Sequence, residues 1–342
     1  MIFDPRNILV IDFGQLGDVV MSLPALRATR ERFPHAQLTV AVGKPGNEVV
    51  EMSGHADAVI AVDRVGLRDG FKPLSIMRIV QLVKDVRRRQ FDFVIDLHSF
   101  SETNLLGFLS GAPKRLFSRR PGRSIDLLAN FSPSPPVELN NQIRHLVDRY
   151  LDVLRPLGVE GICRVPKLMT RSNDDRTVDA MLRKAKGYTS APLVGLFPGA
   201  GHPGRCWPLE RFVELADSLS RNDGVRTIVF AGPEERSLVP RMHELFPSAL
   251  ILDRLTIPQL ASALARLGVF VTNETGPMHI ATAVGTAVVV LLDCPTPNNF
   301  VPLADQHRVI FSDRVVEITT EEVYAATREL LVGSRTARLF SS

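Results

Sequence analysis

Cysteine, tryptophan and long apolar runs are all scarce in this chain of 342 residues. Its three cysteines, Cys163, Cys206 and Cys294, lie far apart and form no C-x-x-C pair. This spacing argues against a disulfide framework or a structural zinc site, and it favours a reducing compartment. The uncharged, mostly apolar stretch at residues 280–292 has only 13 residues, whereas a helix that spans a bilayer needs about 20. We therefore expect no transmembrane helix.

The N-terminal stretch also lacks the pattern of a signal peptide. Asp4 and Arg6 precede the first apolar run, and that run is too short to be the apolar segment of a leader. Together with the cysteine pattern, this predicts a soluble cytoplasmic protein.

The excess of positive charge is small and uneven. The chain carries 41 Lys and Arg against 37 Asp and Glu, a formal net charge of +4. Residues 1–170 contribute 23 basic and 18 acidic side chains, an excess of +5, and residues 171–342 contribute 18 and 19, an excess of −1. The balance is too mild for a dedicated nucleic-acid-binding protein, but it is compatible with a first half that faces an anionic partner.

Short β-branched runs alternate with longer helical patterns along the whole chain. Strands are predicted at residues 8–13, 38–42, 58–62, 93–97, 115–117, 193–197, 227–231, 250–252, 269–272 and 288–291. Helices are predicted at residues 19–33, 74–89, 102–110, 141–157, 209–220, 234–246, 257–265, 277–284 and 320–331. This alternation predicts an α/β fold with two tandem Rossmann-like domains, whose ligands bind at the carboxyl ends of parallel strands.

The length fits two domains, which we place at residues 1–168 and 175–342 with a linker near 166–175. Residues 118–139 are rich in Pro, Ser and Arg and are predicted to form a long surface loop. Such a loop is either functional or a plain connection.

The first candidate loop, FGQLGD at residues 13–18, follows a strand and opens a helix. Gly14 and Gly17 let the backbone turn tightly and leave room for a ligand. Asp18 then either caps the helix or serves as a general base for an incoming hydroxyl.

The second candidate loop runs from residue 198 to 208 and contains G-x-G-x-x-G, the dinucleotide fingerprint, between Gly199 and Gly204. Two prolines delay the helix to about Pro208, so the loop is better interpreted as a glycine-rich cradle in which Arg205 reaches a phosphate or diphosphate. Trp207 is predicted to anchor the loop by packing.

The third candidate loop, TNETGPMH at residues 272–279, again joins a strand to a helix. The N–H groups of Thr275 and Gly276 at a helix N-terminus would form an anion site. Glu274 suits sugar or ribose hydroxyls. His279 lies one turn into the helix and is either a ligand contact or structural.

A weaker signal follows the second strand of the second half. An acid there commonly accepts hydrogen bonds from ribose hydroxyls, and of the adjacent Glu234 and Glu235 we favour Glu235. Leu255 either lines a nucleobase pocket or belongs to the core.

Five basic residues and no acid lie between Lys114 and Arg123. They form either a solvated surface or a site for a phosphorylated, lipid-borne acceptor at an anionic membrane. The second interpretation predicts that Arg119, Arg120 and Arg123 line the acceptor side of the site.

These loops together resemble glycosyltransferase family 9, the ADP-heptose:lipopolysaccharide heptosyltransferases. The resemblance covers nearly the whole chain and rests on ILVIDFGQLGDVVMSLPALRATRERFPHAQLTV, PGAGHPGRCWPLERFVELA, VTNETGPMHIATAVGT and, at residues 145–150, HLVDRY. It implies the GT-B architecture, in which two Rossmann-like domains face a central cleft. The acceptor would bind the first domain and the nucleotide-sugar the second, with a last helix that often crosses back to the first.

By this resemblance, Asp18 matches the catalytic aspartate that deprotonates the acceptor hydroxyl in an inverting transfer. Thr275 and Gly276 match the residues that bind the donor diphosphate, and His279 matches the histidine of that motif. Gly14 and Gly17 would shape the acceptor side, whereas Gly199, Glu235 and Leu255 would contact the donor.

Two positions depart from the family pattern. Arg205 stands where the family usually has lysine; it keeps the charge, so diphosphate binding is expected to survive. Glu274 stands where aspartate is usual, which leaves the donor sugar open. The resemblance implies no metal and no cofactor, since the nucleotide-sugar is a substrate.

The leading hypothesis is therefore an inverting glycosyltransferase that moves heptose from ADP-heptose to an anionic lipopolysaccharide-core acceptor, with peripheral contact at the inner face of the inner membrane. One alternative is a family member with another nucleotide-sugar or another acceptor, such as a protein. Others are an NAD(P)-dependent oxidoreductase and an inactive nucleotide-binding or scaffold protein.

Overall fold

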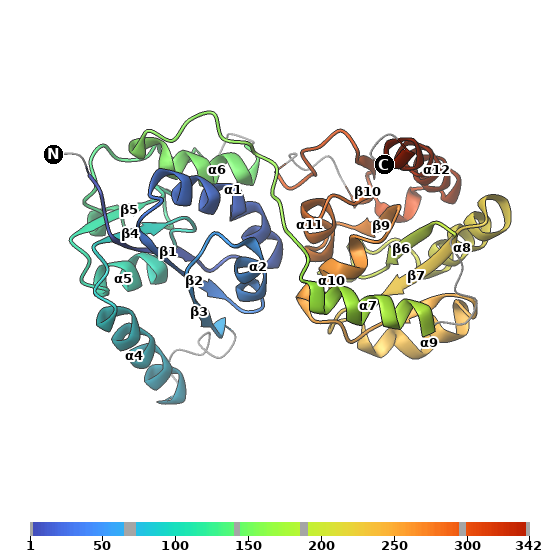
Figure 1. The fold of residues 1–342 in the computed structure, drawn as a ribbon, viewed down its shortest axis with the longest axis horizontal. Coiled ribbons are helices and arrows are strands. Elements are labelled where there is room, and N and C mark those ends of the chain that lie inside the picture. The colour runs from blue at the N-terminus through green and yellow to red at the C-terminus, as the bar shows by residue number, and fades with distance from the viewer. Residues whose placement is uncertain (1–2, 65–72, 140–143, 185–190, 294–298, 340–342) are drawn as a thin grey trace. The chain divides into compact units, whose positions relative to one another are not determined.

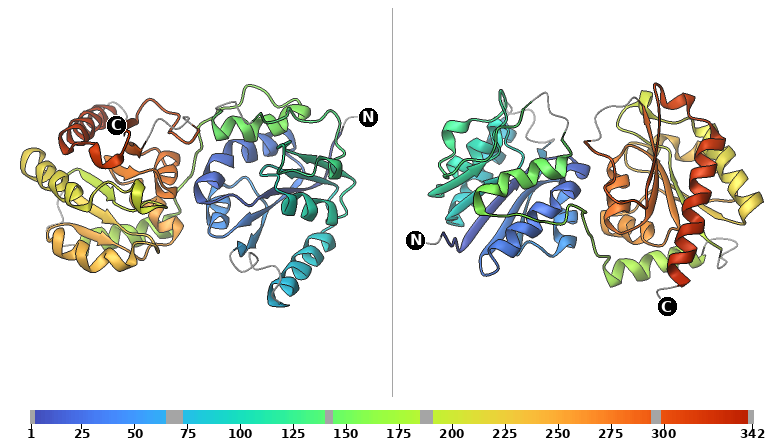
Figure 2. Two further views of the ribbon diagram at one scale, coloured as in Figure 1. Left: turned by 180° about the vertical axis from the view of Figure 1, so that it is seen from behind. Right: turned by 90° about the horizontal axis from the view of Figure 1, so that it is seen from above.

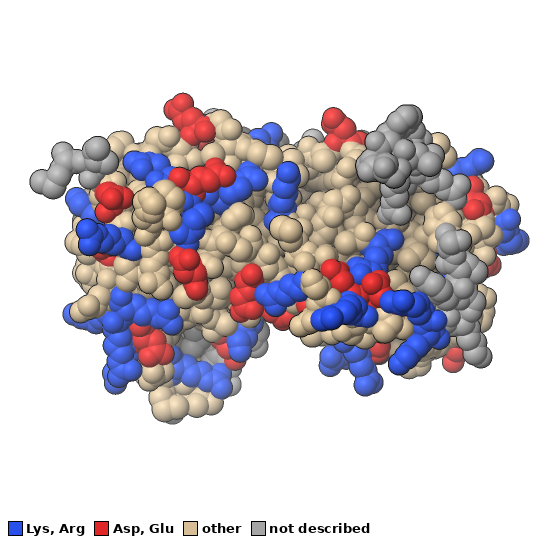
Figure 3. Space-filling view, viewed as in Figure 1, with Lys and Arg blue, Asp and Glu red and all other residues tan. Residues whose placement is uncertain are grey.

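The chain folds into two compact units, Met1–Pro166 and Lys167–Ser342, each of which is described by itself (Figure 1). The computed structural model describes residues 3–64, 73–139, 144–184, 191–293 and 299–339. Cys294 lies outside this part of the chain. Because Lys167 belongs to the second unit, the charge excess counted by unit is +4 in the first and 0 in the second. Acidic and basic side chains are interspersed on both units in the view of Figure 3.

The first unit is built on a five-stranded sheet in the order β3-β2-β1-β4-β5, and every neighbouring pair is parallel. The strands are β1 (Asn7–Asp12), β2 (Gln37–Gly43), β3 (Ala58–Val62), β4 (Phe93–Asp96) and β5 (Lys114–Phe117). The helices are α1 (Leu16–Arg32), α2 (Gly46–Ser53), α4 (Pro73–Arg88), α5 (Ser101–Leu109) and α6 (Leu146–Leu154), with short 3₁₀ turns η1 (Asp126–Leu128) and η2 (Arg155–Leu157).

Both faces of this sheet are covered, as Figure 2 shows. Successive strand residues point to opposite faces. Leu9 and Ile11 of β1 pack with Val86 of α4 and Leu106 of α5 on one face. The alternate residues of β1 are also fully buried, on the face where α1 packs against α2 and α6. This double burial explains why the strands are continuous apolar runs rather than alternating ones.

The second unit has a six-stranded parallel sheet in the order β11-β10-β9-β6-β7-β8. Its strands are β6 (Leu193–Phe197), β7 (Arg226–Phe230), β8 (Leu250–Leu252), β9 (Val269–Asn273), β10 (Ala287–Asp293) and β11 (Arg308–Ser312). The helices are α7 (Ser172–Lys184), α8 (Leu209–Asp223), α9 (Val239–Leu245), α10 (Ile257–Leu264), α11 (Gly276–Ala283) and α12 (Thr320–Leu339). Short 3₁₀ turns lie at η3 (Pro203–Arg205), η4 (Arg236–Leu238) and η5 (Val315–Glu317).

The last helix, α12, packs within its own unit. Val323, Leu330 and Leu331 are buried in the same core cluster as Phe212 of α8 and Val271 of β9. The described contacts of α12 with β9, β10, β11 and α8 thus place it on the sheet of the second unit. Among the described helices, none is both long enough and apolar enough to cross a membrane.

The predicted α/β fold with two parallel-sheet units is confirmed, and most expected elements are present within two or three residues of their predicted ends. Among the described strands and α-helices, α2, α7 and β11 were not predicted. The helix α7 begins inside the expected linker, and of its thirteen residues only Val178 and Leu182 are buried, so its apolar signal is weak. The helix expected at 141–157 is seen as α6 and η2, and residues 141–143 lie outside the described part.

Candidate functional site

In the first unit, the strand order of the sheet reverses between β1 and β4. Chain connections run outward from these two neighbouring strands to opposite edges, and ligands of open α/β sheets bind at the carboxyl ends of such a strand pair. Asp12 is the last residue of β1, and His98 lies two residues beyond β4. The sheet order therefore brings a carboxylate and an imidazole to the position where a ligand is expected.

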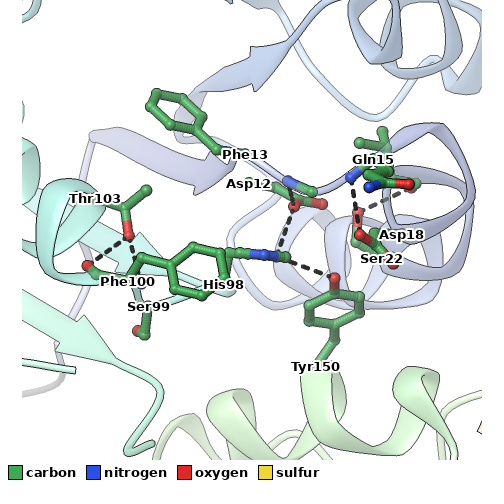
Figure 4. Close-up of polar contacts among 12 residues, drawn as sticks. Asp12, Phe13, Gln15, Asp18, Ser22, His98, Ser99, Phe100, Thr103 and Tyr150 are labelled. Carbon is green, nitrogen blue, oxygen red and sulfur yellow. Dashed lines mark hydrogen bonds and ion pairs between the residues drawn. The ribbon is translucent and has the colours of Figure 1, made fainter. Parts of the chain in front are cut away.

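A buried polar cluster joins three elements at this point (Figure 4). Nδ1 of His98 lies 3.5 Å from Oδ1 of Asp12 and 3.4 Å from the hydroxyl oxygen of Tyr150, which comes from α6. Oδ1 of Asp12 also accepts a hydrogen bond from the N–H of Gly14 at 2.9 Å. Asp12 and Tyr150 are almost fully buried. The cluster therefore fixes the turn after β1 from its buried side.

The charges in this cluster are set by burial and by each other. Burial alone would raise the pKa of Asp12, but the hydrogen bond and charge of His98, with the N–H of Gly14, lower the pKa below its usual value. Burial and the negative charges of Asp12 and Asp18 raise the pKa of Tyr150 well above its usual value. Asp12 is therefore a carboxylate at neutral pH and Tyr150 keeps its proton.

Asp18 extends from the same turn, in the first turn of α1. Its Oδ2 accepts a hydrogen bond from the N–H of Gln15 at 2.8 Å, so the helix-capping contact that the sequence offered as one alternative is present. Only glycine fits at position 14, because a Cβ there would lie 2.4 Å from Cβ of Asp18 and 3.0 Å from Oδ1 of Asp12. Gly17, next to Asp18, is half-buried in α1.

Burial and the nearby negative charge of Asp12 raise the pKa of Asp18, whereas the hydrogen bond from the N–H of Gln15 lowers it. The resulting pKa lies above the usual value for aspartate. A carboxylate with a raised pKa is a stronger base than an exposed one, which is the property a general base requires. Capping by one oxygen is compatible with that role, since a carboxylate has several lone pairs.

The three arginines predicted to line the acceptor side differ in their surroundings. Arg120 donates to the carbonyl of His98 at 2.8 Å and stacks over the ring of Phe100, so it contacts the Asp12–His98 cluster. Arg119 pairs with Asp126 at 3.0 Å. Arg123 is exposed. The structure thus brings one of the three next to the cluster, and the acceptor role of all three stays a prediction.

Asp12, His98, Tyr150 and the buried Asp96 were missed as functional candidates. Oδ1 of Asp96 accepts from the N–H groups of His98 and Ser99 at 3.1 and 2.7 Å, and burial raises the pKa of Asp96 to about 6. Asp96 therefore shapes the turn that presents His98. The available signal was FVIDLHSF, a buried strand that ends in Asp and is followed by His.

In the second unit, the corresponding strand pair is β6 and β9. The loops after these strands are tied together by Asn273, the last residue of β9, which is fully buried. Oδ1 of Asn273 accepts from the N–H of Trp207 at 3.0 Å, and its Nδ2 donates to the carbonyls of Pro198 and Gly199, both at 3.0 Å. One amide thereby fixes both ends of the glycine-rich loop.

That loop is not a dinucleotide fingerprint. It contains the 3₁₀ turn η3 and then an extended Cys206, and α8 begins only at Leu209, five residues after Gly204. The fingerprint requires the third glycine inside the helix, so the oxidoreductase interpretation is wrong. Trp207 packs edge-on against Phe212 and donates to the carbonyl of Ile318 at 2.9 Å, which is the anchoring role predicted for it.

Arg205 reaches the loop after β9. Its guanidinium lies 4.0 Å from a carboxylate oxygen of Glu274 and 3.8 Å from one of Asp293, the last residue of β10, and more than half of its side chain is exposed. Burial and the negative charge of Asp293 raise the pKa of Glu274, whereas the positive charge of Arg205 lowers it. The resulting pKa lies above the usual value for glutamate. The guanidinium is thus loosely held between two carboxylates and accessible from solvent.

The predicted anion site at a helix N-terminus has the expected backbone. Thr275 is the N-cap residue of α11 and Gly276 its first residue, followed by Pro277 in the first turn. The hydroxyl of Thr275 lies 3.3 Å from that of Thr272. His279 is buried and forms part of the inner face of α11.

The side chain of Glu235 lies against Gly199 of the glycine-rich loop. Its Oε2 accepts from the N–H of Gly232 at 2.9 Å, and a Cβ at Gly199 would lie 2.1 Å from its Oε1. Glu234 is exposed, whereas Glu235 is buried, so the preferred acid is the one beside the loop. Leu255 is half-buried before α10.

The comparison with family models decides the class of the protein. A model described as glycosyltransferase family 9 (heptosyltransferase) matches residues 79–325, more than half of the chain. The chain belongs to glycosyltransferase family 9. It is therefore a glycosyltransferase, as the three loops predicted.

Known relatives of this family 9 protein agree with the match over most of its length. Lipopolysaccharide heptosyltransferase 3 from Escherichia coli (strain K12) is 22% identical over 92% of this chain and 95% of that protein. The crystal structure of a family 9 glycosyl transferase from Veillonella parvula has a TM-score of 0.85 at 24% identity, covering 97% of this chain and 99% of that one. E. coli ADP-heptose lipopolysaccharide heptosyltransferase II has a TM-score of 0.78 at 21% identity, covering 96% and 100%. These likenesses confirm the GT-B fold.

We expect Asn273→Ala to lower the free energy of unfolding of the second unit by about 2–4 kcal/mol, because it leaves one N–H and two carbonyls without their partner in a buried site. Trp207 is the single tryptophan of the chain, so its fluorescence in a urea titration reports on this unit. Gln306→Ala is the control; it removes an exposed amide that donates to the carbonyl of Gly285 and should change stability by less than about 0.5 kcal/mol. Equal stability of the two variants would contradict the role of Asn273.

Proposed function

We propose that this family 9 glycosyltransferase transfers heptose from ADP-heptose to an anionic lipopolysaccharide-core acceptor with inversion at the anomeric carbon. The observation that carries the proposal is the position of Arg205: its accessible guanidinium lies 4.0 Å from the carboxylate of Glu274, the residue directly before the N-cap of α11. The relatives of this protein are lipopolysaccharide heptosyltransferases, including an ADP-heptose lipopolysaccharide heptosyltransferase, and they supply the donor and the acceptor class.

The donor diphosphate would bind where backbone N–H groups and a cation converge. The N–H groups of Thr275 and Gly276 open α11, where the helix dipole favours negative charge. Arg205 would supply the charge that neutralises the leaving diphosphate. Glu235, which lies against Gly199, would accept hydrogen bonds from the ribose, and Glu274 from the sugar.

In the transfer, Asp18 would remove the proton from the attacking acceptor hydroxyl. As the oxygen–carbon bond to the anomeric carbon forms, the bond between that carbon and the diphosphate oxygen breaks, and ADP leaves with its electron pair. The proton ends on the carboxylate of Asp18. Support for this role comes from the raised pKa of Asp18 and from the cluster of Asp12, His98 and Gly14 that holds its turn.

The acceptor would be anionic and lipid-borne. The first unit carries the positive excess of the chain, and Arg120 contacts the His98 turn. An acceptor of this kind would bring the enzyme into peripheral contact with the inner face of the inner membrane.

A thermal-shift series with ADP-heptose and with UDP-, GDP- and dTDP-sugars tests the donor. A ligand that binds only the folded state raises the melting temperature, and at 100 times its Kd it adds about 2.7 kcal/mol. We expect ADP-heptose to raise Tm by several degrees and the other nucleotide-sugars and NAD to have little effect. If only another nucleotide-sugar raised Tm, that compound would be assigned as the donor in place of ADP-heptose. If a donor bound but no sugar were transferred to a lipopolysaccharide-core acceptor, the protein would be an inactive nucleotide-binding protein.

A further inference from the structure

The helix α4 of the first unit carries a cluster of exposed apolar side chains. In the described residues, five large apolar side chains within one seven-residue stretch are between 39% and 61% exposed: Leu74, Ile76, Met77, Ile79 and Val80. Exposed apolar residues that occur singly need no explanation, but a contiguous group of them marks an interaction surface.

The exposed stretch is the half of α4 that extends beyond the sheet, as Figures 1 and 2 show. Ser75 and Val86 are the buried positions among the described residues of the helix, and they lie on one side of it. All six residues from 76 to 81 are exposed, so this turn of helix is open to solvent on every side. A single flat protein face could cover only one of those sides.

The same helix becomes basic toward its C-terminus. A stripe with the three- and four-residue spacing of one helix face runs from Met77 and Val80 to Lys84, Arg87 and Arg88. The described ion pairs of the helix are Arg78 with Asp63 at 3.4 Å and Arg88 with Asp85 at 3.8 Å, and they include neither Lys84 nor Arg87. The face opposite the core is thus apolar in its first turns and cationic in its last ones. In Figure 3 the far end of α4 is tan and has blue side chains next to it.

The apolar end lies at the functional edge of the sheet. A helix that connects two parallel strands begins at the carboxyl edge and returns to the amino edge. Because α4 connects β3 to β4, its first turns are at the edge where Asp12, Asp18 and His98 lie.

We propose that α4 is a membrane-docking helix that inserts its first turns, around Met77 and Val80, into an anionic lipid leaflet. Amphipathic helices of this type bury their apolar side chains roughly 5–10 Å into the boundary between headgroups and acyl chains. Lys84, Arg87 and Arg88 then lie among the anionic headgroups. Fluid lipid, unlike a rigid partner, surrounds a helical turn that is exposed on all sides. This inference rests on the proposed function in one respect, since a lipid-borne acceptor gives the enzyme a reason to dock with this edge.

Vesicle co-sedimentation of the full chain, without donor or acceptor, tests the surface. We expect binding to vesicles of phosphatidylcholine with phosphatidylglycerol, weak binding to phosphatidylcholine alone, and weaker binding as salt rises. The double variant Met77→Gln/Val80→Gln should lower partitioning at least about tenfold. The triple variant Lys84→Ala/Arg87→Ala/Arg88→Ala should lower it roughly 100-fold.

Matched control variants carry the same changes on exposed positions of the second unit. Met169→Gln/Val332→Gln and Arg176→Ala/Lys184→Ala/Arg221→Ala replace the same residue types and should bind like the wild type. Wild-type binding by either α4 variant would overturn the proposal, as would equal loss in the controls. Sedimentation velocity tests a further outcome. If the wild type were a dimer and Met77→Gln/Val80→Gln were a monomer, the exposed surface of α4 would bind a second copy of the chain and not lipid, and the proposal would be overturned.

Because the vesicles contain no acceptor, vesicle binding and sugar transfer fail independently. Normal vesicle binding without transfer would reject the proposed function and leave the docking surface in place. Transfer to a water-soluble acceptor without vesicle binding would reject only the docking surface.

Discussion

Asp18→Asn should lower the turnover number of sugar transfer by on the order of 10²–10⁴, the usual contribution of a general base. The asparagine removes the negative charge and keeps an oxygen that can accept from the N–H of Gln15, the contact that Asp18 makes now. Helix α1 should therefore keep its cap, and the loss should be chemical rather than structural. Donor affinity should stay close to that of the wild type, because the proposed donor residues lie in the other unit.

The pH dependence gives this prediction a second readout. The carboxylate acts as a base only when it is ionised, so activity should fall as the pH falls through the pKa of Asp18. Burial and the charge of Asp12 raise that pKa in the free enzyme, so the acid limb of kcat/KM should lie at a higher pH than an ordinary aspartate would give. Asp18→Asn should lose this acid limb together with most of its activity.

Asp174→Asn is the matched control, since Asp174 is likewise an acid in the first turn of a helix, α7. Its removal should cost only the small interaction with the helix dipole, about 0.3–1 kcal/mol, and leave transfer unchanged. Transfer by Asp18→Asn at close to the wild-type rate would show that another group takes the proton. His98 would then be the next candidate, because it shares the Asp12 carboxylate that supports the turn.

The local parts of the fold and of the site could be read from the sequence. Strands such as residues 58–62 and 193–197 were placed to the residue because each is a short apolar run bounded on both sides by aspartate or proline. The loops with Asp18 and Thr275 were found for the same reason: each lies directly between a strand and a helix, so its position follows from the pattern around it.

The cluster around His98 could not be found in this way. His98 is 86 positions from Asp12 and 52 from Tyr150, and only the order β1-β4 of the sheet brings them together. Strand order follows from packing between distant segments, which the residue pattern does not encode locally. The helix α7 was missed for a related reason: it packs against α10, a distant segment of the same unit, with only two buried residues, and the rest of its sequence is mostly polar.

Arg205→Ala should lower kcat/KM for the donor by about 10²–10³, the range found when one group that stabilises a developing negative charge is removed. The loss has two parts. The leaving diphosphate loses its cation, and Glu274 and Asp293, which now flank the guanidinium at 4.0 and 3.8 Å, are left facing it as uncompensated carboxylates. Steady-state kinetics with ADP-heptose as the varied substrate measures the effect.

Three further variants separate these parts. Arg205→Lys should recover much of the activity, since it restores the charge without the fork of the guanidinium. Glu274→Gln in the Arg205→Ala background should recover a smaller share by removing one repulsive carboxylate. Arg221→Ala, on an exposed arginine of α8 that pairs with Asp217 at 3.7 Å, should leave the kinetics unchanged. If Arg205→Ala matched Arg221→Ala, Arg205 would not bind the diphosphate, and the α11 N-terminus would have to hold the donor without it.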